Sequence, residues 1–269
     1  MKKSQTTNKN ADNPATTISL PVVLRARGFR LYTGSRRLID LYLNGGAAVM
    51  GHTIPNVLRE IKNYASRGLY APFPHFTQGR LLKALSLLMP EHTFGIYAAP
   101  PQELETLYNN GKAELWRPFT GTQPNNKLKI LVIPGIQTWR NNLPFGLCVS
   151  ASPDKAASQS EILSPGETLS PILLAAAARG VYNIIASPER IRPQLPRTYK
   201  VLKETSFWQR NGIYLTLKEK PSQEAWAALF EKFLEAGFLL PPVPTQPVIL
   251  PGELSAGEDT KLAKILSLC

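Results

Sequence analysis

Residues 38–61 read LIDLYLNGGAAVMGHTIPNVLREI, and the rest of the chain is organised around this stretch. A short apolar strand leads into a glycine turn at Gly45-Gly46, a run of small residues and then Gly51-His52. Apolar residues at helical spacing follow Pro55, which suits the first turn of a helix. Glycines beside a helix entrance let backbone approach a ligand or another subunit closely. Gly45, Gly46, Gly51 and His52 are therefore candidate ligand-binding residues, although a tight strand-to-helix connection explains the same pattern.

Composition and charge narrow the class of protein. The chain has 269 residues, of which 43% are hydrophobic, enough for one large domain or two small ones. Its net charge of +12 is uneven, because residues 1–92 carry 13 basic and 4 acidic side chains whereas residues 221–269 carry 3 and 6. A basic first third suits nucleic acid, an anionic ligand or an acidic surface in an oligomer. Nucleic acid is the least favoured of these, because no basic block is interleaved with aromatic residues.

Several classes of site are not supported by the sequence. Cys148 and Cys269 form no disulfide framework, which suits the reducing cytoplasm, and we expect a cytoplasmic protein. The three histidines show no metal-ligand spacing, so no metal site is predicted. No apolar run approaches membrane-spanning length, and no membrane partner is predicted. Residues 1–18 are polar and are expected to form a disordered arm.

Strand and helix patterns alternate along the chain. A β-hairpin is predicted over residues 24–43, helices over 54–67 and 81–90, and strands over 128–133 and 145–150. An alanine-rich helix should follow Ser170-Pro171, and a capping box at Ser255-x-x-Glu258 should open the last helix. This alternation argues for an α/β fold.

The same segments resemble a known family. The pattern Ala26-Arg27-Gly28-Phe29 and Leu38-Ile39-Asp40, followed by Gly51-His52-x-x-Pro55, resembles the opening of class III pyridoxal-phosphate aminotransferases, which include the glutamate-1-semialdehyde aminomutases. Further similar pieces follow in the family's order, at residues 81–90, 117–121 with 129–130, 143–146, 170–177, 212–215 and 236–241. The resemblance implies a reduced fold-type-I architecture. Residues 19–50 and 200–269 would form an α+β small domain built from both chain ends, and 51–199 a truncated large-domain remnant.

The departures from the family concern its cofactor. The resemblance implies that the strand aspartate and the Schiff-base lysine should follow Ile133, but residues 134–142 read PGIQTWRNN and contain neither. Lys127 and Lys129 lie upstream and are expected to face solvent at a strand edge. The turn that resembles the phosphate-binding cup contains Pro100 and Pro101, which have no N–H to donate. No cofactor is therefore expected, and pyridoxal phosphate binding is doubtful.

The favoured function is a non-catalytic one, with no catalytic residues: a scaffold, regulator or partner subunit. One alternative is an active aminotransferase or aminomutase whose cofactor residues have moved. Another is a basic-surface protein that binds an anionic metabolite or nucleic acid. Arg140, beside Trp139, is a candidate for holding a carboxylate or phosphate. Asp40 is expected to make a structural hydrogen bond.

Association is the remaining expectation. Residues 69–76 form an aromatic-rich loop in which Tyr70, Phe73 and Phe76 are candidate interface residues. The family resemblance implies dimers, so we expect a homo-oligomer or a hetero-oligomer with a full-length relative. Alternatively, these aromatic side chains fold back over the protein's own core.

Overall fold

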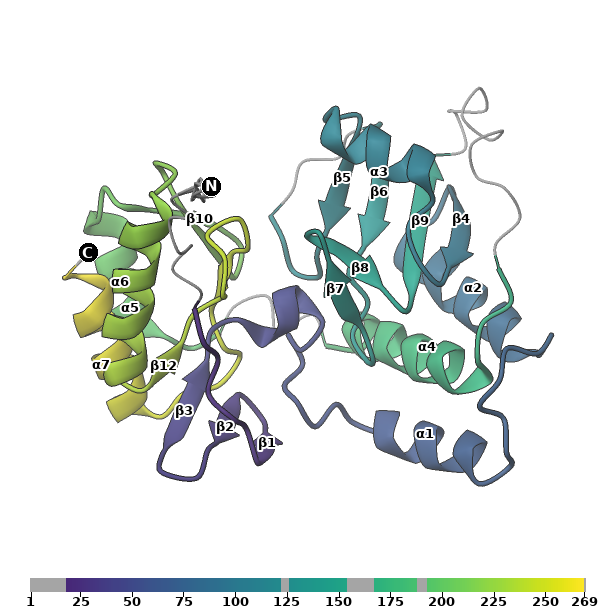
Figure 1. Cartoon of the computed structure of the whole chain (residues 1–269), viewed down its shortest axis with the longest axis horizontal. Helices are drawn as coiled ribbons and strands as arrows, with labels where there is room; N and C mark the ends of the chain where they lie inside the picture. Colours follow the sequence, from purple (N-terminus) through teal and green to yellow (C-terminus); the bar gives the residue numbers. More distant parts are fainter. Residues whose placement is uncertain (1–17, 122–125, 154–166, 188–192, 269) are drawn as a thin grey trace, which may run out of the picture.

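The computed structural model describes residues 18–121, 126–153, 167–187 and 193–268. Figure 1 shows two lobes, with the segment that follows β3 (Arg37–Asp40) passing from one lobe to the other. The first lobe combines the beginning of the chain with its end, and the second contains the middle of the chain. This arrangement confirms the predicted α/β fold class, with one small domain built from both chain ends.

The first lobe, here called the small lobe, contains two sheets. β1 (Arg25–Arg27), β2 (Arg30–Tyr32) and β3 pair antiparallel. β2 and β3 form the predicted hairpin, and the turn that separates β1 from β2 was not predicted. β12 (Phe238–Leu239) joins the open edge of β3 in parallel, so residues about 200 positions apart share one sheet. The second sheet has the order β10 (Trp208–Asn211), β11 (Tyr214–Leu217) and β13 (Val248–Ile249), all antiparallel.

Three helices complete the small lobe: α5 (Pro196–Glu204), α6 (Gln223–Glu235) and α7 (Ala256–Leu266). The apolar face of α6 supplies Trp226, Phe230 and Phe233 to a core shared with the β1–β3 sheet. Fully burying one such side chain contributes roughly 1.5–3 kcal/mol. The two chain ends are therefore held together by a common apolar core as well as by strand pairing.

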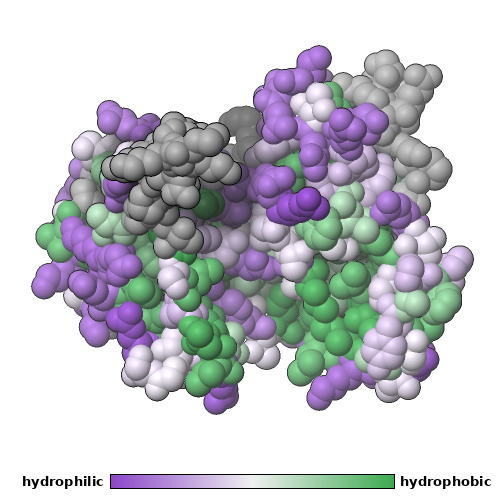
Figure 2. Space-filling model, viewed as in Figure 1, coloured by the Kyte–Doolittle hydropathy of each residue, from purple (hydrophilic) through white to green (hydrophobic). Residues whose placement is uncertain are grey.

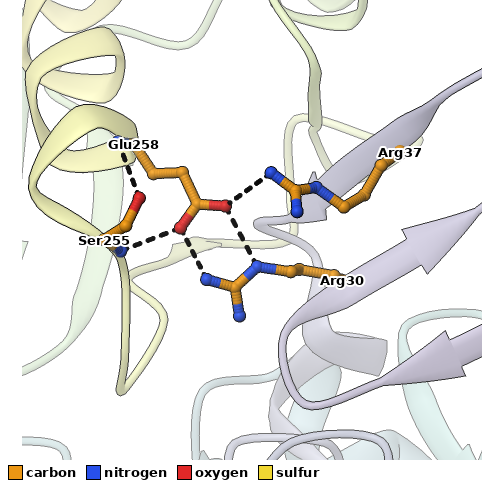
Figure 3. Close-up of polar contacts among 4 residues, drawn as sticks. All are labelled: Arg30, Arg37, Ser255 and Glu258. Atoms are coloured by element: carbon orange, nitrogen blue, oxygen red, sulfur yellow. Dashed lines mark hydrogen bonds and ion pairs between the residues drawn. The ribbon is translucent and has the colours of Figure 1, made fainter.

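An ionic cluster adds a second connection between the chain ends (Figure 3). The predicted capping box at Ser255 is confirmed, and Glu258 also accepts hydrogen bonds from Arg30 Nε at 3.0 Å and from Arg37 at 3.2 Å. Burial raises the pKa of Glu258, but hydrogen bonds from Arg30 and Ser255 outweigh that effect and lower it to about 2. The carboxylate is therefore charged and paired across the physiological pH range.

We expect Glu258→Gln to lower the free energy of unfolding by about 2 kcal/mol at pH 7. A carboxylate whose pKa falls on folding stabilises the protein above its unfolded pKa. The difference between wild type and variant should therefore shrink as pH falls from about 4.5 to about 2. Urea unfolding at a series of pH values measures this. Glu231→Gln, at an exposed position on α6, is the control. A pH-independent difference would contradict the ionic account.

The second lobe, here called the large lobe, is built on one four-stranded sheet. Its order is β4 (His92–Tyr97), β9 (Cys148–Pro153), β6 (Leu128–Leu131) and β5 (Ala113–Trp116). β9 runs antiparallel to both neighbours, while β5 and β6 are parallel. The sequence of β6 and of the residues after it is continuously apolar, because other parts of the protein bury both faces of this strand. Leu131 and Ile133 enter one core cluster, and Leu128 and Ile130 enter another.

Helices cover one face of this sheet in two layers. α2 (Thr77–Leu88) and the alanine-rich α4 (Pro171–Ile185) pack against each other, and α1 (Val57–Ala65) packs on α4 (Figure 1). Small side chains on α4 allow this approach. Gly180 lies so close to Pro134, the residue after Ile133, that an added Cβ would be 1.8 Å from its carbonyl oxygen. The short α3 (Gln102–Asn109) and the hairpin β7 (Thr138–Arg140)–β8 (Leu143–Phe145) complete the lobe.

Local expectations were wrong at several places. α1 begins at Val57, after Asn56 in the left-handed region (φ 61°), so Pro55 precedes the helix instead of opening it. Leu58, one of the apolar residues at helical spacing after Pro55, is 57% exposed. The strands β4 and β5 were not predicted, because their apolar runs are short and mixed with polar residues. Among the described residues, no helix combines the length and apolar character needed to cross a membrane.

Candidate functional site

The two lobes meet at residues 42–46, here called the junction turn. Asp40 ends β3, and one of its carboxylate oxygens accepts hydrogen bonds from the backbone N–H of Tyr42 (2.8 Å) and Leu43 (3.0 Å). The chain then makes a 3₁₀ turn, η1 (Leu43–Gly46), with positive φ at all four residues. Such backbone is costly at Leu43 and Asn44, so it persists where surrounding contacts fix it. The expected structural role of Asp40 is confirmed.

Side chains of the large lobe hold the backbone of the junction turn. Trp139 Nε1 donates to the carbonyl of Asn44 at 2.9 Å, and Arg117 Nε donates to the carbonyl of Gly45 at 2.9 Å. In return, Asn44 Nδ2 donates to the carbonyl of Gln137 at 2.7 Å. Gln137 is itself buried, with its amide bonded to the backbone of Ile133 and Leu147. These bonds place the junction turn directly against the segment that follows β6.

Glycine is required at the junction turn by space as well as by φ. A Cβ on Gly45 would lie 2.6 Å from both Gln246 Oε1 and the Trp139 ring. A Cβ on Gly46 would lie 3.3 Å from the Tyr214 hydroxyl and 3.5 Å from Arg117 Cδ. Two of the predicted candidates, Gly45 and Gly46, therefore lie at a point where both lobes converge.

Arg117 is the main charge at this junction. It follows β5, is half-buried, and its guanidinium carbon lies 5.8 Å from the centre of the Trp139 ring. Burial lowers its pKa, and the neighbouring phenols of Tyr214, Tyr108 and Tyr42 oppose that effect. Tyr214 is buried and donates to the carbonyl of Pro118 at 2.7 Å. Burial raises the pKa of Tyr42 to about 12, so this phenol is neutral at physiological pH.

The other predicted ligand-binding residues lie elsewhere. His52 Nε2 is 2.8 Å from the second carboxylate oxygen of Asp40, and its backbone N–H donates to the carbonyl of Gly28. Gly51 also packs against Gly28: a Cβ added to Gly51 would lie 3.1 Å from the same carbonyl oxygen. These residues brace the hairpin. Arg140 is exposed on the β7–β8 hairpin, 5.8 Å from the Phe145 ring, and does not face the junction turn.

The interface candidates lie on the loop between α1 and α2, at the outer edge of the large lobe (Figure 1). Tyr70, Phe73 and Phe76 are 66%, 50% and 66% exposed, so they do not fold back over the core. The Phe76 ring lies 4.2 Å from the His75 ring and 6.4 Å from the Tyr64 ring, tilted against both. Figure 2 shows apolar side chains gathered over α1 and α4 on the same lobe, where Leu58 is exposed.

Lys127 and Lys129, the two lysines in or beside β6, make no described contact with the junction turn. Lys127 is exposed at the start of β6, as expected. The expectation was wrong for Lys129, which is only 8% exposed and lies 3.4 Å from the carboxylate of Glu114, directly opposite on β5. Both faces of β6 are covered, which the strand pattern alone did not reveal. Lys129 lies three residues before Val132, whose side chain approaches Gly46 of the junction turn, and is therefore roughly 10 Å away along the strand.

The turn after β4 is poor in donors for an anion. The N–H of Ala98 already donates to Glu167 Oε2 at 2.7 Å. α3 then begins behind Pro101, and its first turn carries Glu103 and Glu105. Prolines remove N–H donors, and acidic residues at a helix N-terminus compete with a bound anion for the positive end of the dipole.

Three other candidate sites can be set aside within the described residues. No group of three histidine, cysteine or acidic side chains is placed to hold a metal ion. A groove of about 560 Å³ lies mainly on the small lobe and is lined by apolar residues and prolines, with Lys220, Gln223, Thr245 and Asn142 as its polar side chains. Thr245 donates to Asn142 at 3.3 Å, so two of these polar groups are already paired, and the junction turn is the stronger candidate. The buried thiol of Cys148 has its pKa raised to about 12 by burial and is unreactive.

Comparison with solved structures identifies the architecture. The ornithine aminotransferase PY00104 from Plasmodium yoelii superposes with a TM-score of 0.64 at 13% identity, covering 92% of each chain. Acetylornithine aminotransferase from Elizabethkingia anophelis gives 0.64 at 12% identity, covering 96% of this chain and 95% of that one. An omega-transaminase from Sphaerobacter thermophilus gives 0.60 at 10% identity, over 92% and 90%. The chain has the fold of a class III aminotransferase. At these identities the likeness concerns the fold alone.

Sequence comparisons add two relatives. The chain is 26% identical over 277 residues to an uncharacterized protein of Treponema pallidum (strain Nichols), covering 85% of this chain and 88% of that protein. A 74-residue stretch is 36% identical to an uncharacterized protein of Borreliella burgdorferi, covering 27% and 28%. No protein-family model matches the chain.

The aminotransferase fold implies pyridoxal phosphate, which can be tested against the residues present. The carboxyl end of β6 offers Pro134, Gly135 and Gln137 and no lysine or acid. The turn before α3 offers prolines and glutamates where a phosphate needs donors. These residues do not fit the group. The sequence already indicated both points, whereas Arg117, Trp139, Tyr214 and Gln246 came together only in three dimensions.

Proposed function

We propose that this protein is a non-catalytic member of the aminotransferase fold that forms no covalent link to pyridoxal phosphate. The observation that supports this proposal is that residues 134–142, where a cofactor lysine is expected, contain no lysine and are fixed by packing and hydrogen bonds. The turn at Pro134 is packed against Gly180 of α4, and Gln137 is bonded to backbone on two sides. The lysines of β6 lie at its opposite end, with Lys129 paired to Glu114.

The rival proposal is an active aminotransferase whose cofactor residues have moved. It needs a reactive amine near the junction turn, whereas the polar and aromatic side chains that contact this turn in the described part of the chain are Arg117, Trp139, Tyr214 and Gln246. It also needs phosphate donors, which the turn before α3 lacks. Both requirements weigh against this rival. The degenerate character, the shortened large domain and the cytoplasmic location belong to our proposal as well.

The absorption spectrum of the protein tests the proposal. When the protein is expressed in cells supplied with pyridoxine and purified by gel filtration, we expect no visible absorption band to co-migrate with it. A covalent cofactor link would give a coloured protein. A visible band at a constant ratio to protein absorbance across the peak would contradict the non-catalytic assignment.

We also propose that the protein works in association, through the aromatic loop between α1 and α2. Three half- to two-thirds-exposed aromatic side chains, with Leu58 exposed on the adjacent helix, form an apolar surface of the kind enriched at interface cores. Arg59, Lys62 and Arg67 lie on or just beyond α1, so the same surface carries positive charge. An aromatic loop next to exposed basic residues of α1 suits a partner with acidic residues at its rim, either a second copy or a full-length relative.

We expect Phe73→Asp and Phe76→Asp to weaken association by at least tenfold in the dissociation constant. Loss of an interface aromatic typically costs more than 1 kcal/mol. Light scattering over a dilution series measures this, for the protein alone and mixed with a full-length relative from the same cell. Leu87→Asp, at a 58% exposed position on α2, is the matched control and should change nothing. A monomer that ignores the relative would defeat this proposal.

A further inference from the structure

A groove between α6 and α7 gathers the positive charge of the last fifth of the chain. Residues 221–269 carry 3 basic and 6 acidic side chains, and all three basic ones, Lys232, Lys261 and Lys264, line this groove of about 410 Å³. Glu235 is the one acidic residue that lines it. None of the ion pairs among the described residues involves Lys261 or Lys264. The groove is therefore basic, in a region whose other charged side chains are acidic.

The floor of the groove is apolar. Ile265 is buried at its base, Leu268 is 59% exposed, and Ala236 lies opposite on α6. The groove residues of α7 and the turn after it are spaced three, four and seven positions apart, so they share one face of the helix. Lys232 Nζ donates to the carbonyl of Leu268 at 2.9 Å and ties this end of the chain to α6. Both helices lie on the side of the small lobe that faces away from the large lobe (Figure 1).

The shape of the groove favours one kind of occupant. Apart from Ile265, every residue that lines it is exposed, so the groove is shallow. Sites for small molecules enclose most of the ligand surface, which a shallow groove does not do. An amphipathic helix buries one apolar face in a groove and leaves its polar face in water. The distance along α7 from Lys261 to Leu268 is roughly 10 Å, which matches about two turns of such a helix.

We propose that the groove between α6 and α7 is a docking site for an acidic amphipathic helix of a partner protein. Apolar side chains of that helix would pack on Ile265 and Leu268, and acidic side chains beside them would pair with Lys261 and Lys264. A basic helix would be repelled by the same lysines. This surface lies on the opposite lobe from the aromatic loop between α1 and α2, so the proposal is independent of association through that loop.

Fluorescence anisotropy of a labelled synthetic peptide tests the site. A peptide of about 14 residues, with leucine at helical spacing and glutamate elsewhere, should bind the full chain with a Kd of roughly 10–100 µM in 50 mM NaCl. Lys261→Glu combined with Lys264→Glu should weaken binding at least tenfold, because two attractions become repulsions. Lys200→Glu combined with Lys203→Glu is the matched control. It makes the same charge change at the same spacing, at exposed positions on α5, and should bind the peptide as wild type does.

A second variant and a second peptide test the remaining features of the site. Leu268→Asp, at an exposed position, should weaken binding at least fivefold and serves if the α7 double variant fails to fold. A peptide with lysine in place of glutamate should not bind. Equal affinity of the two double variants for the acidic peptide, or equal affinity of wild type for the two peptides, would overturn the proposal. So would the absence of binding at 1 mM acidic peptide.

Two other occupants are distinguished by the same materials. Sodium decanoate, below its micelle concentration, should displace the peptide only weakly; displacement at concentrations below the peptide's Kd would assign the groove to a small amphiphile and overturn the proposal. Light scattering of the protein alone should give the same mass for wild type and for the α7 double variant. A dimer that only this double variant dissociates would assign the groove to a second copy of the chain and overturn the proposal as well.

Discussion

Gly180→Ala should lower the free energy of unfolding by more than about 3 kcal/mol. The added methyl group would lie 1.8 Å from the carbonyl oxygen of Pro134 and 2.8 Å from its carbonyl carbon. Both are backbone atoms, so no side-chain rotation relieves the overlap, and α4 and the end of β6 must move apart. Overpacking a core typically costs 1–3 kcal/mol and more where backbone must shift. Urea unfolding, with midpoint and slope both fitted, measures the loss.

The control for Gly180→Ala is Gly79→Ala. Gly79 lies in the first turn of α2, is exposed, and has nothing within 4 Å of an added Cβ. Replacing an unstrained helical glycine by alanine removes backbone freedom from the unfolded chain, so this variant should be unchanged or more stable by about 0.5 kcal/mol. If Gly180→Ala falls within 1 kcal/mol of wild type, the close packing of α4 on the Pro134 turn is wrong.

Gly45→Ala should cost about 2–4 kcal/mol. Roughly 1 kcal/mol is expected from placing a Cβ at φ +62°. A further 1–3 kcal/mol comes from the overlap with Gln246 and Trp139, each 2.6 Å from the new atom. The variant should also loosen the contact between the lobes, because Trp139 holds the carbonyl of Asn44. Chemical unfolding gives the free energy, and limited proteolysis reports the loosening.

Gly68→Ala separates these two contributions. Gly68 has φ +72° and no atom within 4 Å of an added Cβ, so its variant carries the backbone strain without the overlap. We expect a cost of about 1 kcal/mol. Equal losses for Gly45→Ala and Gly68→Ala would mean that the junction turn accommodates a side chain and that the two lobes are less tightly joined there.

Local sequence patterns predicted the pieces of this fold that have strong periodicity or capping signals. The β2–β3 hairpin, the alanine-rich α4 and the capping box at Ser255 are examples. The order of the pieces indicated the aminotransferase fold even though overall identity to its solved members is only 10–13%. β4 and β5 were not predicted, because each is short and contains polar residues whose burial depends on neighbouring strands.

The candidate site was only half predictable. Gly45 and Gly46 stand out in the sequence as adjacent glycines between a predicted strand and a predicted helix, although a tight connection explains the same pattern. Arg117 has no such signal, since its environment is made by residues 42, 139, 214 and 246, which are distant in the chain. Arg140 was the arginine expected to hold an anion because it neighbours Trp139, but adjacent residues on a strand point to opposite faces. That alternation places the Trp139 ring, and not Arg140, against the junction turn.

The central claim is that this chain keeps the aminotransferase fold without a covalent cofactor link. Borohydride reduction in the presence of excess pyridoxal phosphate, followed by peptide mass mapping, tests it most directly. We expect scattered, substoichiometric labelling of exposed lysines such as Lys127, at the level found after unfolding in urea. Stoichiometric labelling of a single lysine in the folded protein, at Lys129 or elsewhere, and its loss on unfolding, would contradict the claim.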